Sequence, residues 1–169
     1  MDYFLTTARL GFRCWRADDL PLAMELWRDA QVTALIGGPF TAEEVRARLE
    51  QEIAQMLNRR VQYWPIFLFE GDEFAGRAGL RPWSLEPRIY ELGFHLLPSH
   101  WGKGLAAEAA RAAIDYGFST LGAEVLFAGH HPRNDRSRRV LKKLGFVEAG
   151  EEFYEPSGVV EPVYLLHRK

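Results

Sequence analysis

The chain has few of the features that mark secreted and membrane proteins. Its single cysteine, Cys14, cannot form a disulfide within the chain. Residues 1–7 lack the pattern of a secretory signal, and no apolar run approaches the ~20 residues needed to span a bilayer. The formal net charge of −2 gives no general attraction to nucleic acid or to anionic membranes. We therefore expect a soluble cytoplasmic protein with neither nucleic acid nor a membrane as its partner.

The length and composition favour a single domain. Residues 1–169 are 47% hydrophobic and contain no repeat, linker or low-complexity tract, so one compact α/β domain is the simplest organisation. Alternating apolar residues predict strands, and capping signals followed by a one-sided apolar face predict helices. Strands are expected at 7–15, 63–69, 74–80, 89–97, 125–128, 146–154 and 159–167, and helices at 18–28, 42–57, 103–118 and 134–144. This order predicts a mixed sheet of about seven strands with helices on both faces.

The most informative segment is a glycine-containing turn between an expected strand and an expected helix. It comprises Trp101, Gly102, Lys103, Gly104, Leu105 and Ala106. The two glycines let the backbone turn tightly and approach a ligand closely. The first turn of the following helix has N–H groups without intrahelical partners and the positive end of the helix dipole. The segment therefore predicts a site for a phosphate or pyrophosphate group.

The same glycines also fit a dinucleotide-binding pattern, Gly102-x-Gly104-x-x-Ala107, with Glu124 near the spacing of a ribose-binding acid. The context argues against a nicotinamide or nucleotide binder, because residues 98–101 separate the glycines from the preceding strand. Glu124 also opens a strand, whereas the ribose-binding acid closes one. A nucleotide P-loop is excluded, since its Gly-Lys-Ser/Thr ending is missing.

A second segment runs from Asn134 to Phe146 and reads Asn-x-x-Ser-x-x-x-Leu-x-Lys-x-Gly-Phe. Asn134 is a favoured helix N-cap, and Gly145 is an ordinary residue after a helix C-terminus, so structure alone explains each of them. The arginines and lysines between them indicate a mostly solvated helix face.

Taken together, the glycine turn and the 134–146 segment resemble the acetyl-CoA-binding core of the GNAT N-acetyltransferases, especially the RimJ/RimL-like branch. The first family signature is Gln/Arg-x-x-Gly-x-Gly/Ala. Here Trp101 stands in the Gln/Arg position, Gly104 is the central glycine and Ala106 is the last small residue. The resemblance follows the order of elements over residues 7–168. It implies the GNAT fold, acetyl-CoA as co-substrate, an amine acceptor and no metal.

The resemblance also implies which residues bind the coenzyme. Backbone N–H groups of the glycine turn would hold the pyrophosphate, and the 134–146 segment would face the pantetheine arm. Arg139 or Lys142 would meet the 3′-phosphate. A backbone N–H near Phe94–Leu96 would polarise the acetyl carbonyl. The coenzyme-binding residues implied are Phe94, Leu96, Trp101, Gly102, Lys103, Gly104, Leu105, Ala106, Asn134 and Ser137.

The candidates for proton transfer come from the same resemblance. Glu91 is a candidate general base, and a solvated strand carboxylate is the alternative interpretation of it. His130 and His131 stand at the end of the following strand, where other members place a base. Many members have a tyrosine that protonates the departing thiolate, and Leu141 occupies its position here. Ser137 is the candidate substitute.

The acceptor is argued only from chemistry. An α-amine of pKa ~7.7–8 is far more often unprotonated at pH 7 than a lysine of pKa ~10.4, so weak base machinery suits a protein N-terminus or another amine of low pKa. A non-catalytic CoA-binding module of the same fold is the alternative, suggested by the missing tyrosine. A homodimer is common in this branch, although no residue here demands one.

Overall fold

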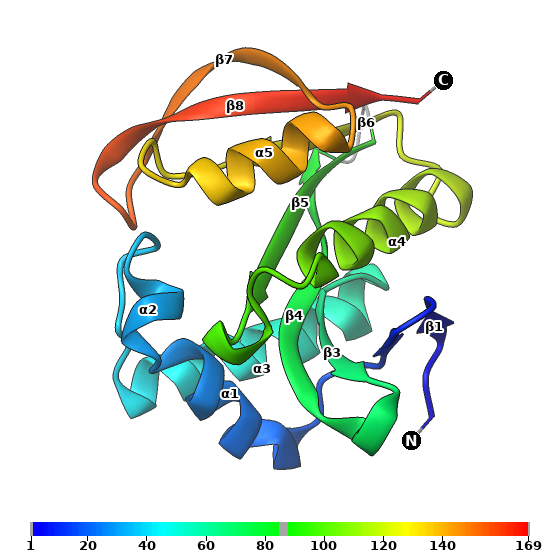
Figure 1. Ribbon diagram of the computed structural model, residues 1–169, viewed down its shortest axis with the longest axis vertical. Coiled ribbons are helices and arrows are strands. Elements are labelled where there is room, and N and C mark those ends of the chain that lie inside the picture. The colour runs from blue at the N-terminus through cyan, green and yellow to red at the C-terminus, as the bar shows by residue number, and fades with distance from the viewer. Residues whose placement is uncertain (1, 85–87, 169) are drawn as a thin grey trace.

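The computed structural model describes residues 2–84 and 88–168, which form one eight-stranded sheet with helices against it (Figure 1). The strand order is β1-β2-β3-β4-β5-β6-β8-β7. β5 and β6 pair in parallel, and the other neighbouring strands pair antiparallel. The strands are β1 (Leu5–Thr6), β2 (Leu10–Phe12), β3 (Tyr63–Leu68), β4 (Phe74–Ser84), β5 (Ile89–Leu96), β6 (Val125–Gly129), β7 (Val147–Tyr154) and β8 (Val159–His167). The predicted mixed α/β sheet of the GNAT fold is confirmed.

The helices begin and end close to the residues expected from their capping signals. Thr41 forms the predicted capping box, since its side chain accepts the Glu44 N–H while the Glu44 side chain accepts the Thr41 N–H. Asn134 caps a helix by accepting the Ser137 N–H at 3.1 Å. The helices are α1 (Leu20–Trp27), α2 (Ala30–Thr33), α3 (Ala42–Arg59), α4 (Leu105–Ser119) and α5 (Asp135–Lys143), with short 3-10 turns at Ala17–Asp19, Glu70–Asp72 and Pro98–His100.

Two apolar layers cover the sheet, one on each face. On one face the small residues Ala109 and Ala113 of α4 are fully buried, and Leu141 of α5 packs in the same core. On the other face Leu26 of α1 and Leu49 of α3 pack in a second core. Figure 1 shows α4 and α5 on the near side of the sheet and α3 behind it. Among the described residues, no helix combines the length and apolarity needed to cross a membrane.

The expected N-terminal strand at 7–15 is too long and is corrected by the structure. Thr7 turns the chain after β1, because its hydroxyl accepts the backbone N–H groups of Arg9 and Leu10. Only Leu10–Phe12 then pairs with β3. Past Phe12 the chain leaves the ladder, and Arg13 donates two hydrogen bonds of 2.6 and 2.7 Å to Asp19.

Two other elements differ from the expectation. β4 runs to Ser84, beyond the expected end at residue 80, because Pro82 still pairs with Tyr90 and is accommodated where the register shifts. α2 is a single turn that the apolar pattern does not mark. Asp29 starts it by accepting the N–H groups of Gln31 and Val32.

Candidate active site

The candidate site lies where β5 and β6 separate. The two strands pair only from Ile89 to Glu91 and from Val125 to Phe127. Beyond this point β5 continues beside β4, and β6 continues beside β8. The edge of β5 that faces β6 is therefore open from Leu92 onward, and a ligand can reach backbone groups that a closed sheet would use.

A cavity of about 1410 Å³ occupies this opening and extends to the start of α4 and α5. It brings together nearly all of the residues predicted from the sequence. The predicted residues that line it are Glu91, Phe94, Leu96, Trp101, Gly102, Gly104, Leu105, Ala106, His130, Asn134 and Ser137. Lys103 is exposed and is not among the lining residues; its carbonyl accepts a hydrogen bond of 2.9 Å from Arg9.

The glycine turn has the geometry of an anion site. Gly102 and Gly104 have φ of 75° and 78°, a conformation that disfavours residues with a side chain. Gly104 is the N-cap of α4 and provides no side-chain cap, so the N–H groups of the first turn are left open toward the cavity. Residues 98–100 form a 3-10 turn between β5 and the glycines, which is the interruption that argues against a dinucleotide fingerprint.

Trp101 contributes its side chain to the turn in a structural role. Its indole N–H donates to the Leu96 carbonyl at 2.8 Å, which ties the glycine turn to the end of β5. The Arg136 guanidinium lies 4.8 Å from the centroid of the Trp101 ring, so α5 covers the same turn. On α4, Glu108 binds Arg9 through its side chain at 2.5 Å, which holds the beginning of that helix against the N-terminal segment.

The residues of α5 divide between cavity and core. Ser137 and Arg139 line the cavity, whereas Lys142 is not among the lining residues. Leu141 also borders the cavity, but it is 1% exposed and packs in the core, so an apolar side chain fills the place where the family often has tyrosine.

Glu91 is a titratable residue of β5 that lines the cavity, as His95 of the same strand does. Glu91 is partly buried and pairs across the strands with Arg81. Burial raises the pKa of Glu91, and this effect outweighs the lowering caused by Arg81 and by a hydrogen bond from the Tyr63 hydroxyl. Tyr63 reaches Glu91 because Gly93 has no side chain: a Cβ there would lie 2.7 Å from the tyrosine ring. A carboxylate with a raised pKa is suited to accept a proton near neutral pH.

The two histidines have structural partners. His130 is 6% exposed; its Nδ1 lies 2.9 Å from the His131 carbonyl and its Nε2 lies 3.4 Å from the Tyr164 hydroxyl. Its ring also stacks on Tyr164. The Nδ1 of His131 accepts the Arg133 N–H, and burial, followed by the Arg133 charge, lowers the pKa of His131. Both histidines line the cavity, as Glu91 does.

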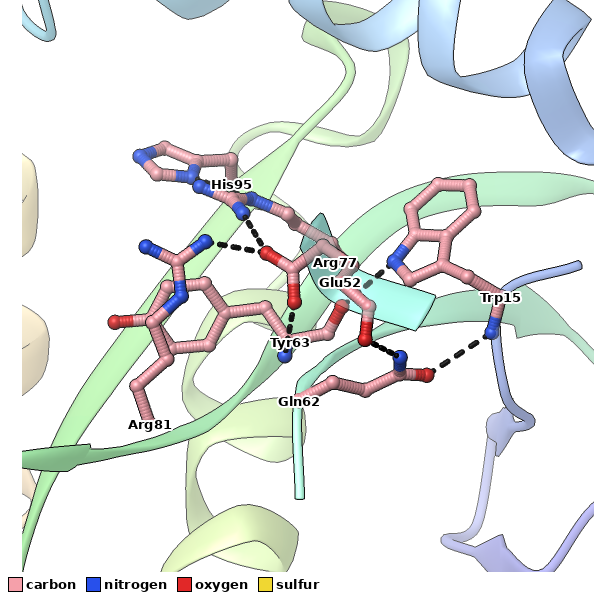
Figure 2. Close-up of polar contacts among 7 residues, drawn as sticks. All are labelled: Trp15, Glu52, Gln62, Tyr63, Arg77, Arg81 and His95. Atoms are coloured by element: carbon pink, nitrogen blue, oxygen red, sulfur yellow. Dashed lines mark hydrogen bonds and ion pairs between the residues drawn. The ribbon is translucent and has the colours of Figure 1, made fainter. Parts of the chain in front are cut away.

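A buried polar network that was not predicted from the sequence joins α3 to β3, β4 and β5 (Figure 2). Glu52 of α3 is 1% exposed and binds Arg77 and Arg81 of β4. Its Oε2 accepts the Tyr63 backbone N–H at 3.0 Å, and the Arg77 Nε donates to His95 at 3.1 Å. Burial lowers the pKa of His95 well below its usual range, so the ring is neutral and accepts this bond.

A signal for this network is present in the sequence. Val45, Leu49 and Glu52 share one face of α3, and all three are buried. A carboxylate on the apolar face of a helix needs a cationic partner. Arg77 and Arg81 lie four residues apart on one face of a strand and would have met that need.

Among the described residues there is no group of three or more side chains that could hold a metal ion. The titratable groups and open backbone donors suit transfer of a group to a nucleophile that loses a proton.

Comparisons with known proteins point the same way. Residues 9–147 match the family described as the acetyltransferase (GNAT) domain. An uncharacterised N-acetyltransferase, p20, from Bacillus licheniformis is 30% identical over 165 residues, which cover 95% of this chain and 93% of that protein.

Solved structures share the fold. An acetyltransferase of the GNAT family from Bacillus anthracis is 26% identical with a TM-score of 0.84, over 96% of this chain and 97% of that one. A ribosomal-protein alanine acetyltransferase from Vibrio fischeri has a TM-score of 0.76 at 19% identity, over 98% and 97% of the two chains, and so shows the fold alone.

Proposed function

This chain belongs to the GNAT acetyltransferase family and is an acyltransferase; from that premise we propose that it transfers the acetyl group of acetyl-CoA directly to a primary amine. The observation that supports the proposal most strongly is the cavity that joins the open edge of β5 to the uncapped start of α4. It offers backbone donors for a pyrophosphate at one end and a carboxylate of raised pKa at the other. We also propose the RimJ/RimL-like branch, on the Trp-Gly-x-Gly-x-Ala form of the glycine turn.

The residues present fit acetyl-CoA. The first-turn N–H groups of α4 would hold the pyrophosphate, and the 134–137 stretch would face the pantetheine arm. Arg139 lines the cavity and would meet the 3′-phosphate. Backbone N–H groups of β5 near Phe94 and Leu96 would donate to the acetyl oxygen as negative charge develops on it.

The chemical step moves two protons and replaces a C–S bond with a C–N bond. The amine nitrogen forms a C–N bond to the thioester carbonyl carbon while its proton passes to Glu91. The C–S bond breaks, and the thiolate takes a proton from water or from the Ser137 hydroxyl, which recovers it from solvent as Glu91 releases its proton to solvent. A thiol of pKa ~8.5 is an acceptable leaving group, so the leucine at position 141 is compatible with turnover.

The proposed acceptor is an amine of low pKa, such as a protein N-terminal α-amine or a small-molecule amine. A single carboxylate is a weak general base, so it works best on an amine that is often unprotonated at neutral pH.

The first test is thermal unfolding with acetyl-CoA, NADH and ATP added separately. A ligand of the folded state at a hundred times its dissociation constant adds ~2.7 kcal/mol, or about 5–11 °C for a domain of this size. We expect a shift with acetyl-CoA alone. A larger shift with NADH would favour the nicotinamide alternative and would contradict the proposal.

The second test is product formation. Acetylated amine detected by mass spectrometry supports the transferase. A shift with acetyl-CoA but no product with any amine would favour the non-catalytic CoA-binding module.

A further inference from the structure

Three arginine side chains reach the cavity from one side. Arg77 and Arg81 lie on the face of β4 that is turned to α3, Arg48 projects from α3 itself, and all three line the cavity. Glu91 lies on the same face, since it pairs with Arg81 across the strands. The arginines therefore stand where the acceptor amine must approach the base.

Glu52 binds two of the three arginines, and Glu91 lies beside one of them, Arg81. The Glu52 carboxylate accepts hydrogen bonds from Arg77 at 2.9 Å and from Arg81, so two guanidinium groups share one carboxylate (Figure 2). The Arg81 guanidinium lies 4.2 Å from the centroid of the Tyr63 ring, and its buried Nε has no hydrogen-bond partner among the described residues. Arg81 is thus held in a fixed plane and retains donor capacity.

Arg48 has no carboxylate partner within residues 2–84 and 88–168. Its guanidinium stacks at 3.7 Å from the centroid of the Phe40 ring. Stacking fixes the plane of the group and leaves its N–H edge free for planar anions. Burial lowers the pKa of Arg48, while the charges of Glu44 and Glu52, which lie beyond ion-pair distance, raise it. Because no carboxylate contacts the guanidinium directly, its N–H donors can bind an anionic ligand.

Carboxylates line the same cavity as the arginines. Besides Glu91, which lies beside Arg81, they are Asp135, Glu152, Glu155 and Glu161. Both kinds of charge act on the Tyr154 hydroxyl: burial raises its pKa, Glu91 and Glu161 raise it further, and Arg48 and Arg81 lower it. The cavity therefore presents cationic as well as anionic side chains to a ligand. A ligand with only ammonium groups would pair with the carboxylates and leave Arg48 without an anion.

We propose that the acceptor carries an anionic group, a carboxylate or a phosphate, which binds between Arg48 and Arg81 while its amine lies toward Glu91. The proposal rests on the function proposed above and names its substrate class. Guanidinium groups bind both anions through paired N–H donors, so the two are distinguished by experiment.

The test compares acceptors that share an amine and differ in the anion. Glycylglycine is measured against glycylglycinamide, and ethanolamine phosphate against ethanolamine, with spermidine as a purely cationic acceptor. We expect kcat/KM to be about tenfold to a hundredfold higher for the anionic member of one pair, as for one hydrogen bond to a charged group. The pair that shows the preference identifies the anion.

Variants tie the preference to Arg48. Arg48→Gln is expected to bring the ratio of the two kcat/KM values close to one. Arg46→Gln is the matched control, since Arg46 is exposed on the same helix and does not line the cavity. Should Arg48→Gln fail to fold, succinate and inorganic phosphate test the wild-type protein, because one of them must compete with the neutral acceptor.

The outcomes distinguish failure of the anion site from failure of the proposed transferase function. Equal kcat/KM within both pairs, a clear preference for spermidine, or an unchanged ratio in Arg48→Gln would overturn the anion site and leave the transferase intact. No acetylation of any amine would overturn the proposed function, and this inference with it. A preference that Arg48→Gln abolishes and Arg46→Gln retains would support the site.

Discussion

At the scale of single residues, Glu91 lies at the last pair of β5 with β6 and lines the cavity that opens there. If it is the general base, Glu91→Gln removes the proton acceptor and leaves the coenzyme site in place. We expect kcat to fall by ~10²- to 10⁴-fold while acetyl-CoA still shifts the thermal unfolding midpoint. Glu151→Gln is the control, because Glu151 is exposed on β7 and does not line the cavity. Activity within threefold of wild type in Glu91→Gln would exclude the role.

The same carboxyl predicts a dependence of stability on pH. Burial raises the folded-state pKa of Glu91 above its unfolded value, so the folded protein holds this proton more tightly. The stabilising contribution is full below the unfolded pKa and is lost as pH rises through the folded pKa. Glu91→Gln should therefore gain stability relative to wild type between pH 4 and pH 7, as measured by urea unfolding. A constant difference across that range would contradict the desolvated environment.

At the scale of elements, the start of α4 is the proposed binding site for the pyrophosphate of the coenzyme. Gly104→Val places a β-branched residue at φ 78° in the N-cap, and the resulting backbone strain disturbs the open N–H groups. We expect at least a tenfold loss of acetyl-CoA affinity by calorimetry. The fold should survive, because the nearest atom to the added Cβ would be 3.7 Å away, at the end of Arg9.

Gly71→Val is the matched control for Gly104→Val. Gly71 has φ 81° and open space around it, in the turn between β3 and β4. The two variants should lose similar stability, whereas only Gly104→Val should lose affinity. Equal affinity in both would show that the pyrophosphate does not bind at α4.

Local signals explain why some elements were predictable. The α5 boundaries follow from Asn134 and Gly145, each of which acts through its own neighbours in sequence. The glycine turn is likewise a local pattern. The separation of β5 from β6 is different in kind, because it depends on β6 pairing with β8 about forty residues away. The sequence therefore predicted the helix boundaries and the glycine turn better than the opening between β5 and β6.

At the scale of the whole molecule, the arginine-lined part of the cavity is built from residues far apart in the chain. Glu52 meets Tyr63, Arg77 and Arg81 across sequence separations of 11, 25 and 29 residues. No periodicity within one element encodes these contacts. The need for a cationic partner is nevertheless visible in the sequence, because Glu52 lies on the apolar face of α3 and its carboxylate must be paired when it is buried.

We expect this network to affect both stability and the proposed acceptor preference, and substitutions at Glu52 test both. Glu52→Leu leaves Arg77 buried without a counter-charge, which costs ~3–5 kcal/mol, or about 6–20 °C in the unfolding midpoint. Adding Arg77→Met should restore much of the loss, because Arg81 has a side chain 28% exposed and can reach water. Glu50→Leu, on the exposed face of α3, is the control and should change stability little.

Denaturant unfolding of the three Glu52 and Glu50 variants measures the stability effect, and the acceptor pairs measure the specificity. In Glu52→Leu/Arg77→Met the plane of Arg81 is no longer fixed by a carboxylate, so the preference for an anionic acceptor should weaken even where stability returns. Recovery of stability together with the acceptor preference would mean that Glu52 only stabilises the fold. Recovery of stability alone would mean that one buried carboxylate both holds α3 on the sheet and orients the side chain that selects the substrate.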